Sequence, residues 1–381
     1  MKYMYFILYA VSFCVGVIGY KRRKHRPVVL TLLLLWMTFL MVFRYGQGTD
    51  YFSYNWLFQR YATYGSVQAT VVNAQNLHGE VGFRIIGMLF DNHYEWFIAL
   101  SSVYEMACLG YFLLKRCEKP ELSFLLFVPT MGFVYYFSAI RQGLMIATFL
   151  AFGIDLIERR RWVRYVILVS LMAVFFHASS MTLLLIPLAV YLRLDDILTI
   201  LLPIALVIGG IVLSGAFQSV LQRVPYIGTY FRTSGISYFA VAERLFSLIV
   251  ILLLYLPERS ADRKDPWWIK AYLICFVIYF PLIASATVST RMIICYKAME
   301  AMIVPNLLVR KHRFRQIAAV YFILLTAVLY LHNVKGSIDQ GKYHEEINAV
   351  NYPYVSIFDR EEIEEYREPD IYYPLVKRTG R

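Results

Sequence analysis

Long apolar runs separated by short polar stretches dominate this chain. The run from Pro27 to Phe43 carries no charged residue, and comparable runs recur along most of the 381 residues. A helix that crosses a bilayer needs about 20 predominantly apolar residues. The pattern therefore predicts an all-α polytopic membrane protein.

The spacing of these runs predicts about twelve transmembrane helices, each close to the length that a bilayer requires. The expected segments are 3–20, 27–43, 93–114, 122–137, 141–157, 165–178, 180–193, 197–214, 243–256, 271–288, 291–309 and 316–332. The segments 165–178 and 180–193 are short and are joined by His177 to Ser180. We expect one of this pair to be tilted or broken.

Composition agrees with a membrane protein. Hydrophobic residues make up 59% of the chain and charged residues 17%, with a mean hydropathy of +0.54. A soluble protein would carry about 25% charged residues. The five cysteines have neither paired nor metal-ligand spacing, so no disulfide framework or zinc site is indicated. The first apolar segment is followed, not preceded, by basic residues, and we expect it to be a membrane helix rather than a signal peptide.

Basic clusters predict the topology. Lys and Arg gather at 21–26, 115–119, 159–164, 259–270 and 310–315, whereas the alternate connections lack such clusters. The positive-inside rule places the clusters in the cytoplasm. The segments 44–92 and 215–242 then face outward, as does a polar tail, 333–381, that we expect to pack on the outer loops of the membrane domain, 1–332. The net charge of +12 mainly reflects this topology, and no basic soluble domain suggests nucleic-acid binding.

The cations expected at the outer boundary are almost all arginine, apart from Lys2. They are Arg44, Arg60, Arg84, Arg141, Arg223, Arg232, Arg244 and Arg291. A planar guanidinium binds phosphate through two parallel hydrogen bonds, which an ammonium cannot do. We expect Arg44, Arg141, Arg244 and Arg291, at predicted helix ends, to bind a diphosphate, with Gln142 as a further substrate contact. The alternative is that these arginines anchor the protein at the membrane interface or pair with Asp and Glu.

Arg84 is an ambiguous member of this set. It lies four residues after Glu80, a spacing that suits an ion pair within a helix. For Arg84 the structural role and the substrate-binding role are therefore equally compatible with the sequence.

Three residues are candidates for a general base, which needs both reach and a suitable pKa. Asp50 follows the glycine-bearing stretch Gly46 to Thr49, and it is equally suited to capping a helix that starts at Tyr51. His177 lies at the outer end of a predicted helix, where a histidine titrates near neutral pH. A histidine that is simply hydrogen-bonded to a neighbour is the alternative there. Glu80 is the third candidate.

Lys297 and Glu300 lie near the middle of a predicted helix, three residues apart. An unpaired charge at the centre of a bilayer costs at least about 2.5–3.5 kcal/mol. We therefore expect the two side chains to pair inside the helix bundle.

An ordered set of short motifs resembles the EpsG family of bacterial exopolysaccharide and O-antigen polymerase-like (Wzy-type) proteins. The motifs are Arg44-Tyr45-Gly46-x-Gly48-x-Asp50-Tyr51-x-x-Tyr54, Glu80-x-Gly82-Phe83, Phe137-Ser138-x-x-Arg141-Gln142 and Phe176-His177-x-Ser179, with the late Arg291 and Tyr352-Pro353-Tyr354. Each motif alone is weakly specific, and the specificity comes from their order on a multi-helix protein.

The resemblance implies a polysaccharide polymerase in the bacterial cytoplasmic membrane with an outward-facing active site. Such enzymes join oligosaccharide units carried on undecaprenyl diphosphate, have a GT-C-like helical fold and work without a metal ion or other cofactor. The implied partners are the lipid-linked oligosaccharide, the polysaccharide chain, the lipid bilayer, and a chain-length regulator and flippase of the same pathway. The arginines suit a diphosphate leaving group, and Tyr51 and Tyr54 are expected to stack on sugars.

Three other functions compete with this one. A flippase for the same lipid-linked oligosaccharide would also need arginines, and Lys297 and Glu300 are the residues that favour transport. A glycan ligase or single-sugar transferase would share the fold and most of the site. A membrane acyltransferase would use His177 but leaves the outward arginines unexplained. The sequence does not specify the sugar, the linkage or the chain length.

Overall fold

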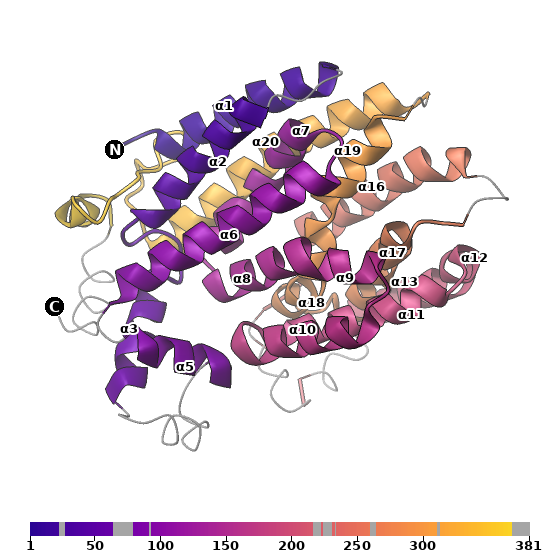
Figure 1. The fold of residues 1–381 in the computed structure, drawn as a ribbon, viewed down its shortest axis with the longest axis horizontal. Helices are drawn as coiled ribbons and strands as arrows, with labels where there is room; N and C mark the ends of the chain where they lie inside the picture. The colour runs from indigo at the N-terminus through magenta and orange to yellow at the C-terminus, as the bar shows by residue number, and fades with distance from the viewer. Residues whose placement is uncertain are drawn as a thin grey trace. The chain divides into compact units, whose positions relative to one another are not determined.

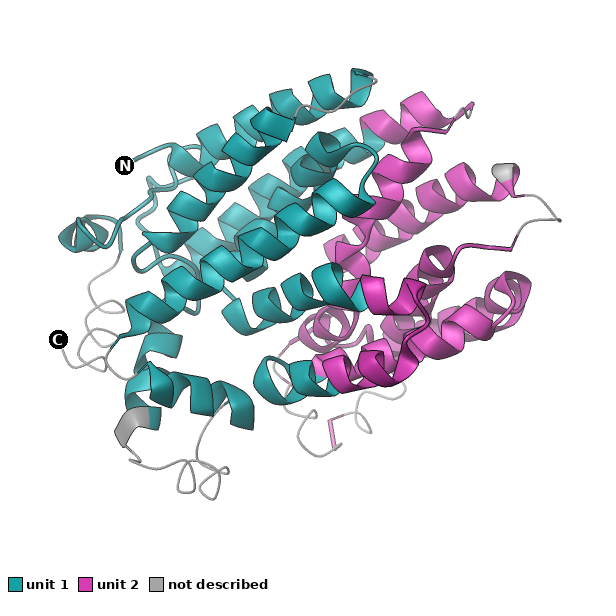
Figure 2. Cartoon of the chain, in the orientation of Figure 1, with its two compact units in different colours: residues 1–154, 170–178, 321–381 teal, residues 155–169, 179–320 magenta. Residues whose placement is uncertain are grey.

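The computed structural model describes residues 1–22, 27–63, 79–90, 93–215, 222–223, 231–232, 234–259, 264–310 and 313–367. Within these residues every regular secondary-structure element is a helix. Backbone contacts divide the chain into two compact units, shown in Figure 2. Unit 1 comprises residues 1–154, 170–178 and 321–381. Unit 2 comprises residues 155–169 and 179–320.

Unit 1 contains the first helices of the chain and most of the last one (Figure 1). Its elements are α1 (Met4–Lys21), α2 (Pro27–Val42), α3 (Tyr51–Thr63), α5 (Val81–Leu89), α6 (Tyr94–Arg116), α7 (Pro120–Phe127), the π-helical η2 (Val128–Tyr136), α8 (Ile140–Thr148), η3 (Phe149–Gly153), the larger part of α20 (Arg315–Gly341) and the short η8 (Arg360–Glu365).

The helices of unit 1 pack through aromatic and small residues. Helix α1 packs on α7 and also meets α20, where Tyr9 stacks on Tyr330 with ring centroids 4.4 Å apart. Tyr9 Oη and Thr326 Oγ1 lie 3.2 Å apart in the same contact. Helix α6 packs on both α2 and α8, so it lies at the centre of the unit. The last long helix therefore returns to the first, and this contact closes unit 1.

Unit 2 contains the middle of the chain. Its elements are α9 (Ile154–Glu158), the first half of α10 (Trp162–Phe175), η4 (Ala178–Leu184), α11 (Leu185–Tyr191), α12 (Leu194–Asp196), η5 (Ile197–Leu201), α13 (Leu202–Leu213), α16 (Tyr238–Tyr255), η6 (Leu256–Glu258), α17 (Trp267–Tyr279), η7 (Phe280–Leu282), α18 (Ala286–Ala298) and α19 (Glu300–Leu308). Helix α17 packs on α18, α11 and α13, and α16 packs on α19.

Several helices begin at residues that satisfy or remove a free backbone N–H. Pro27 and Pro120 open α2 and α7, where their missing N–H would have no partner in any case. The Ser237 hydroxyl accepts from Ala240 N at 3.3 Å before α16, and Ser285 accepts from Val288 N at 3.3 Å before α18. Each is an N-cap of the preferred residue type.

Every predicted membrane segment overlaps a helix or a run of consecutive helical elements. Among the described residues, six helices are long and apolar enough to cross a membrane: Met4–Lys21, Tyr94–Arg116, Ile140–Glu158, Leu194–Leu213, Tyr238–Tyr255 and Arg315–Gly341. Shorter apolar helices include Pro27–Val42, Trp162–Phe175, Ala178–Tyr191 and Trp267–Leu282. The chain is thus a multi-pass membrane protein, and the number of crossings stays a prediction.

Several predicted helix boundaries differ from the structure. Helix α16 starts at Tyr238 rather than 243, because Ser237 caps it. The break expected at 288–291 falls at 283–285, between Pro281 and the Ser285 cap, so Arg291 lies inside α18 and does not begin a helix. Helix α20 continues beyond residue 332 to Gly341.

The long α20 also alters the expected boundary between the membrane domain and the tail. Its polar end stays helical because Tyr330, Val334 and Ile338, spaced four residues apart, are all buried along one face. Residue 333 is therefore inside a helix. The tail that follows α20 contacts the loop after α2. Tyr45 N donates to Val355 O at 2.9 Å, and Ile357 N donates to Phe43 O at 2.8 Å.

Candidate functional site

Arg44, which we expected to bind phosphate, lies inside unit 1 with 1% of its surface exposed. Its Nη1 donates to Met41 O at 2.6 Å and Ser102 Oγ at 3.0 Å, and Nη2 donates to Tyr136 O at 3.3 Å. The guanidinium thereby joins the end of α2 to α6 and η2. This geometry makes Arg44 a structural residue and does not support direct phosphate binding.

The glycines after Arg44 serve the packing of the loop. Gly46 and Gly48 have φ values of 63° and 81°, which favour glycine. A Cβ on Gly48 would lie 2.7 Å from Ser138 Cβ and 2.8 Å from Phe137 O, and a Cβ on Gly46 would overlap Ile363. The two glycines thus allow the loop backbone to lie close to neighbouring protein atoms.

Asp50 lies immediately before α3, and its backbone oxygen accepts from Tyr54 N at 2.9 Å. Thr49 Oγ1 donates to its Oδ1 at 3.3 Å, while Thr49 N donates to Ser138 Oγ at 2.9 Å. The carboxylate is partly exposed. Both interpretations made from the sequence, a helix cap and a general base, fit this position.

The two tyrosines expected to stack on sugars have different surroundings. Tyr51 is 2% exposed and contacts Tyr45, Phe52 and Tyr94 edge to face. Neither face of its ring is available for a sugar in this structure, and Tyr51 acts as a core residue. Tyr54 instead accepts a hydrogen bond from Arg141 Nε at 3.2 Å.

Arg141 is the centre of a polar cluster in unit 1, which we call the Arg141 cluster and define as Tyr54, Glu80, Arg141, Gln142 and His177. Arg141 Nη1 forms an ion pair with Glu80 Oε2 at 2.5 Å. The guanidinium also lies 5.5 Å from the ring centroid of Tyr54, a cation–π contact. The side chains of Arg141 and Glu80 are only 10% and 16% exposed. Residues from four separate sequence motifs therefore meet here.

Glu80 is held at both carboxylate oxygens. Besides Arg141, it accepts from Ala178 N at 3.2 Å through Oε1. Burial alone would raise the pKa of Glu80, but the charges of Arg141 and His177 and the backbone donors outweigh it, and the net pKa is lower than the ordinary value. A carboxylate that is strongly ionised and already paired is a weak base. Glu80 is better suited to positioning Arg141.

His177 lies in the turn between α10 and η4, as the sequence predicted. Its ring Nε2 is 3.3 Å from Gln142 Nε2, and its backbone N–H donates to Met172 O at 2.9 Å. Gln142 therefore orients the imidazole ring. His177 is only partly buried, so it is also reachable from outside the helices. This combination suits an acid–base residue.

Arg84 has a structural contact. Its Nε donates to Gly79 O at 2.8 Å, and the side chain is buried in α5. Glu80 forms its ion pair with Arg141. The sequence left two roles open for Arg84, and this contact favours the structural one.

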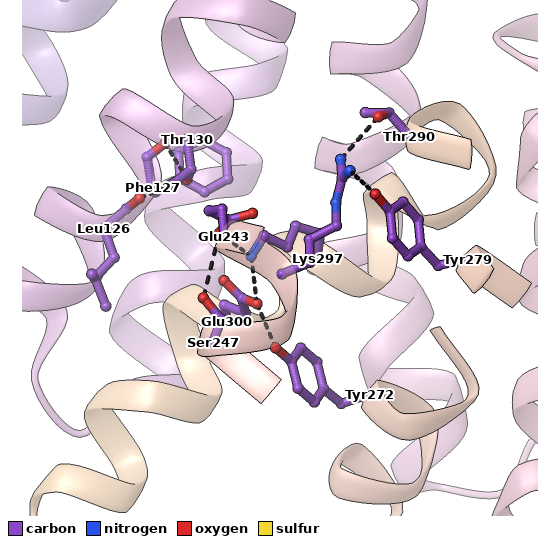
Figure 3. A network of polar contacts seen from close by, with 11 residues as sticks. Leu126, Phe127, Thr130, Glu243, Ser247, Tyr272, Tyr279, Thr290, Lys297 and Glu300 are labelled. Carbon is purple, nitrogen blue, oxygen red and sulfur yellow. Dashed lines mark hydrogen bonds and ion pairs between the residues drawn. The ribbon is translucent and has the colours of Figure 1, made fainter. Parts of the chain in front are cut away.

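A second polar cluster lies in unit 2 and is shown in Figure 3. Arg244, in the second turn of α16, donates from Nη1 to Tyr279 Oη and from Nη2 to Thr290 Oγ1, both at 2.9 Å. Its guanidinium also stacks over the Tyr279 ring at 4.6 Å. Thr290 directly precedes Arg291 in α18. Both of these hydrogen-bond partners of Arg244 are neutral oxygens.

Lys297 and Glu300 pair as the sequence predicted, with Nζ 2.7 Å from Oε1. The network is larger than expected, because Glu243 of α16 also contacts Lys297 Nζ, at 2.6 Å. Tyr272 Oη donates to Glu300 Oε1 at 2.6 Å (Figure 3). Glu243 was not singled out from the sequence, although it is adjacent to Arg244 and is an acidic residue in an apolar helix.

Glu105 of α6 is another buried residue that sequence reasoning missed. It is fully buried, and neither of its oxygens has a hydrogen-bond partner within the part of the chain that the structure describes. A Cβ added to Gly143 of α8 would overlap its Oε1. One turn earlier on α6, Ser102 accepts from Arg44. In the sequence, the signal for Glu105 was a single acidic residue inside an apolar run.

Comparison with known proteins agrees with this picture. Searches of curated proteins and of solved structures found no match. The model of the EpsG family matches residues 27–356, a range that contains both polar clusters. The family is linked to exopolysaccharide biosynthesis. Because the match covers most of the chain, this multi-pass membrane protein belongs to the EpsG family.

Proposed function

We propose that this protein is a polysaccharide polymerase of GT-C-like architecture with about twelve membrane helices. It joins oligosaccharide units carried on undecaprenyl diphosphate at the outer face of the cytoplasmic membrane. The observation that supports this proposal most is the Arg141 cluster, which unites a fixed guanidinium, a paired carboxylate and an oriented histidine. Preorganised hydrogen-bond donors of this kind stabilise the charge that develops on a diphosphate leaving group.

In the proposed reaction a hydroxyl of the incoming unit attacks the anomeric carbon of the growing glycan. The bond from that carbon to the diphosphate oxygen breaks, and the bonding electrons leave with the diphosphate. His177 or Asp50 takes the hydroxyl proton, and Arg141 stabilises the charge on the departing diphosphate. Glu80 and Tyr54 hold Arg141 in place, and Gln142 orients His177. Arg244 and Arg291 are proposed as phosphate-binding residues of unit 2.

Reconstitution tests the proposal. The full chain in lipid vesicles receives a repeat unit linked to undecaprenyl diphosphate, and the products are separated by size. We expect longer glycan together with free undecaprenyl diphosphate. Translocation of the unit without chain growth would indicate a flippase instead. Transfer of one glycan to an unrelated acceptor would indicate a ligase or a single-sugar transferase.

The same assay distinguishes the candidate bases. Loss of a general base lowers the rate by about 10²–10⁴-fold. We therefore expect a loss of that order for either Asp50→Asn or His177→Ala, while the protein still inserts normally. Full turnover by both variants would remove the assignment of the base to these two residues.

A further inference from the structure

A cavity of about 870 Å³ opens within unit 2, where the end of α9 and the α11–α12 connection approach the start of α17. It contains neither of the polar clusters described above. Charged side chains dominate its lining, and the rings of Tyr191 and Trp267 form part of its wall. Its volume is large enough for a phosphorylated headgroup or metabolite. We call it the basic cavity.

Positive charge exceeds negative charge in this lining. The cations are Arg160, Arg193, Arg259, Lys264 and Lys270, and the acids are Glu158, Asp195 and Asp265. Two of the acids are already used, because Arg259 contacts Asp195 Oδ1 at 2.5 Å and Asp265 Oδ1 at 2.9 Å. Arg259 is thereby fixed and neutralised. The excess charge belongs to the other cations.

Lys270 is held in place by groups that do not cancel its charge. Its Nζ donates to Val190 O at 2.8 Å and to Leu192 O at 2.9 Å. An ammonium has three N–H donors, so one remains for a ligand. The half-buried side chain lies in the first turn of α17, where the helix dipole also favours an anion.

Three more cations surround this position. Arg160, Arg193 and Lys264 are exposed, and Asp195, the carboxylate that interacts electrostatically with Arg193, is already paired with Arg259. Like charges gathered around one cavity repel each other, and a multivalent anion relieves that repulsion. Arginine and lysine together are the side chains that bind phosphate oxygens best.

We infer that the basic cavity binds a phosphate-bearing ligand. Lys270 supplies a fixed cation, while Arg160, Arg193 and Lys264 close around the phosphate. The positive-inside rule places these basic clusters on the cytoplasmic side. The site is therefore separate from the proposed transfer reaction and does not depend on it. The phosphate comes either from an anionic lipid headgroup or from a soluble phosphorylated compound.

A binding experiment on the full chain tests the site and separates the two sources. Inorganic pyrophosphate is titrated calorimetrically into protein in nanodiscs of zwitterionic lipid. Phosphatidylglycerol retained by the protein is counted by native mass spectrometry. The variant Arg193→Gln/Lys270→Gln removes two cavity cations. The matched control, Lys21→Gln/Arg164→Gln, removes two exposed basic residues outside the cavity.

We expect the cavity variant to weaken binding of one probe by about tenfold or more per cation removed, as loss of a charge-assisted hydrogen bond predicts. The control variant should bind as the wild type does. Loss of pyrophosphate binding identifies a soluble ligand, and loss of retained phosphatidylglycerol identifies a lipid. Equal effects of both variants, or no saturable binding of either probe, would overturn the inference.

A second cavity variant guards against misfolding. Arg160→Gln/Arg193→Gln leaves Lys270 and its carbonyl contacts intact and changes only exposed side chains. It should fold even if the first variant does not, and it should show the same selective loss of binding. Wild-type affinity in this variant, measured with the probe that binds the wild type, would contradict the proposed ligand position.

Discussion

Arg141 is fixed by three kinds of partner at once: a carboxylate, a phenol oxygen and the faces of aromatic rings. An arginine restrained in this way loses little conformational entropy when it binds a phosphate. Arg44 is restrained just as strongly, but its partners are backbone and hydroxyl oxygens inside the protein. Arg44 and Arg141 thus differ in the surroundings of the guanidinium, and this difference is why, of the two, we propose only Arg141 as a phosphate-binding residue.

Arg141→Lys should lower polymer formation by about tenfold or more, because an ammonium cannot form the two parallel hydrogen bonds of a guanidinium. Chain growth in the reconstituted system measures the effect. Arg60→Lys is the matched control, since Arg60 stacks on Trp56 in α3 and is not part of the cluster. Near-wild-type polymer from Arg141→Lys would contradict a bidentate role.

Glu80 gives a prediction about pH. Its pKa in the folded protein is below the ordinary value of 4.5, so the unfolded chain takes up the proton first as the pH falls. The stabilisation from the Glu80 pair is fully present above that ordinary value and disappears as the pH falls through the folded-state pKa. The difference in thermal stability between wild type and Glu80→Gln should therefore be constant near neutral pH and shrink in acid. A difference in thermal stability that grows on acidification would refute the lowered pKa of Glu80. Repeating the comparison in a His177→Ala background isolates the contribution of Arg141 to that pKa.

At the scale of elements, the close contact between α6 and α8 depends on one small residue. A Cβ on Gly143 would lie 2.9 Å from Tyr135 O and would also overlap Glu105. Gly143→Ala should destabilise the protein by about 1–3 kcal/mol, as overpacking does. Gly210→Ala is the control, because nothing lies within 4 Å of that position and alanine favours a helix. Unfolding in detergent measures both, and equal stability of the two variants would argue against the tight contact.

Helices α16, α18 and α19 are linked by the Lys297 network. Lys297→Met would leave the carboxylates of Glu243 and Glu300 buried without their cation. Removing one partner of a buried ion pair costs about 3–5 kcal/mol. We expect low yield and reduced thermal stability for this variant. The triple variant Lys297→Met/Glu243→Gln/Glu300→Gln should recover much of the loss, and a stable Lys297→Met protein would show that the charges do not support each other.

At the scale of the whole molecule, chain ends far apart in sequence complete unit 1. The first residue contacts the tail, since Tyr354 N donates to Met1 O at 3.0 Å. The loop after α2 contacts the same tail, and Gln47 Nε2 donates to Pro353 O at 2.7 Å. The segment carrying Asp50 is therefore held between the membrane helices and the tail.

Truncation after Lys342 should destabilise this loop, because it removes the partners of Tyr45 and Gln47 and leaves their donors unsatisfied. Each buried donor left without a partner costs about 1–3 kcal/mol. We expect earlier thermal unfolding and faster proteolysis near residue 50. Truncation after Arg367 keeps these contacts and serves as the control. Identical proteolysis of the two truncated proteins would show that the tail does not support the loop.

The sequence by itself determined the helical membrane class and the long apolar helices, because apolar length and basic clusters are local properties of the chain. The predicted membrane segments did not include α3 and α5, which lie within the predicted outward segment 44–92. The sequence also identified the Lys297–Glu300 pair, whose members are three residues apart. Local spacing did not reveal that Arg44 is buried, that Tyr51 is a core residue or that Glu105 and Glu243 are buried acidic residues. These depend on which helices pack together. The tertiary structure decided that Glu80 pairs with Arg141 and that His177 faces Gln142, because such contacts join residues 61 and 35 positions apart.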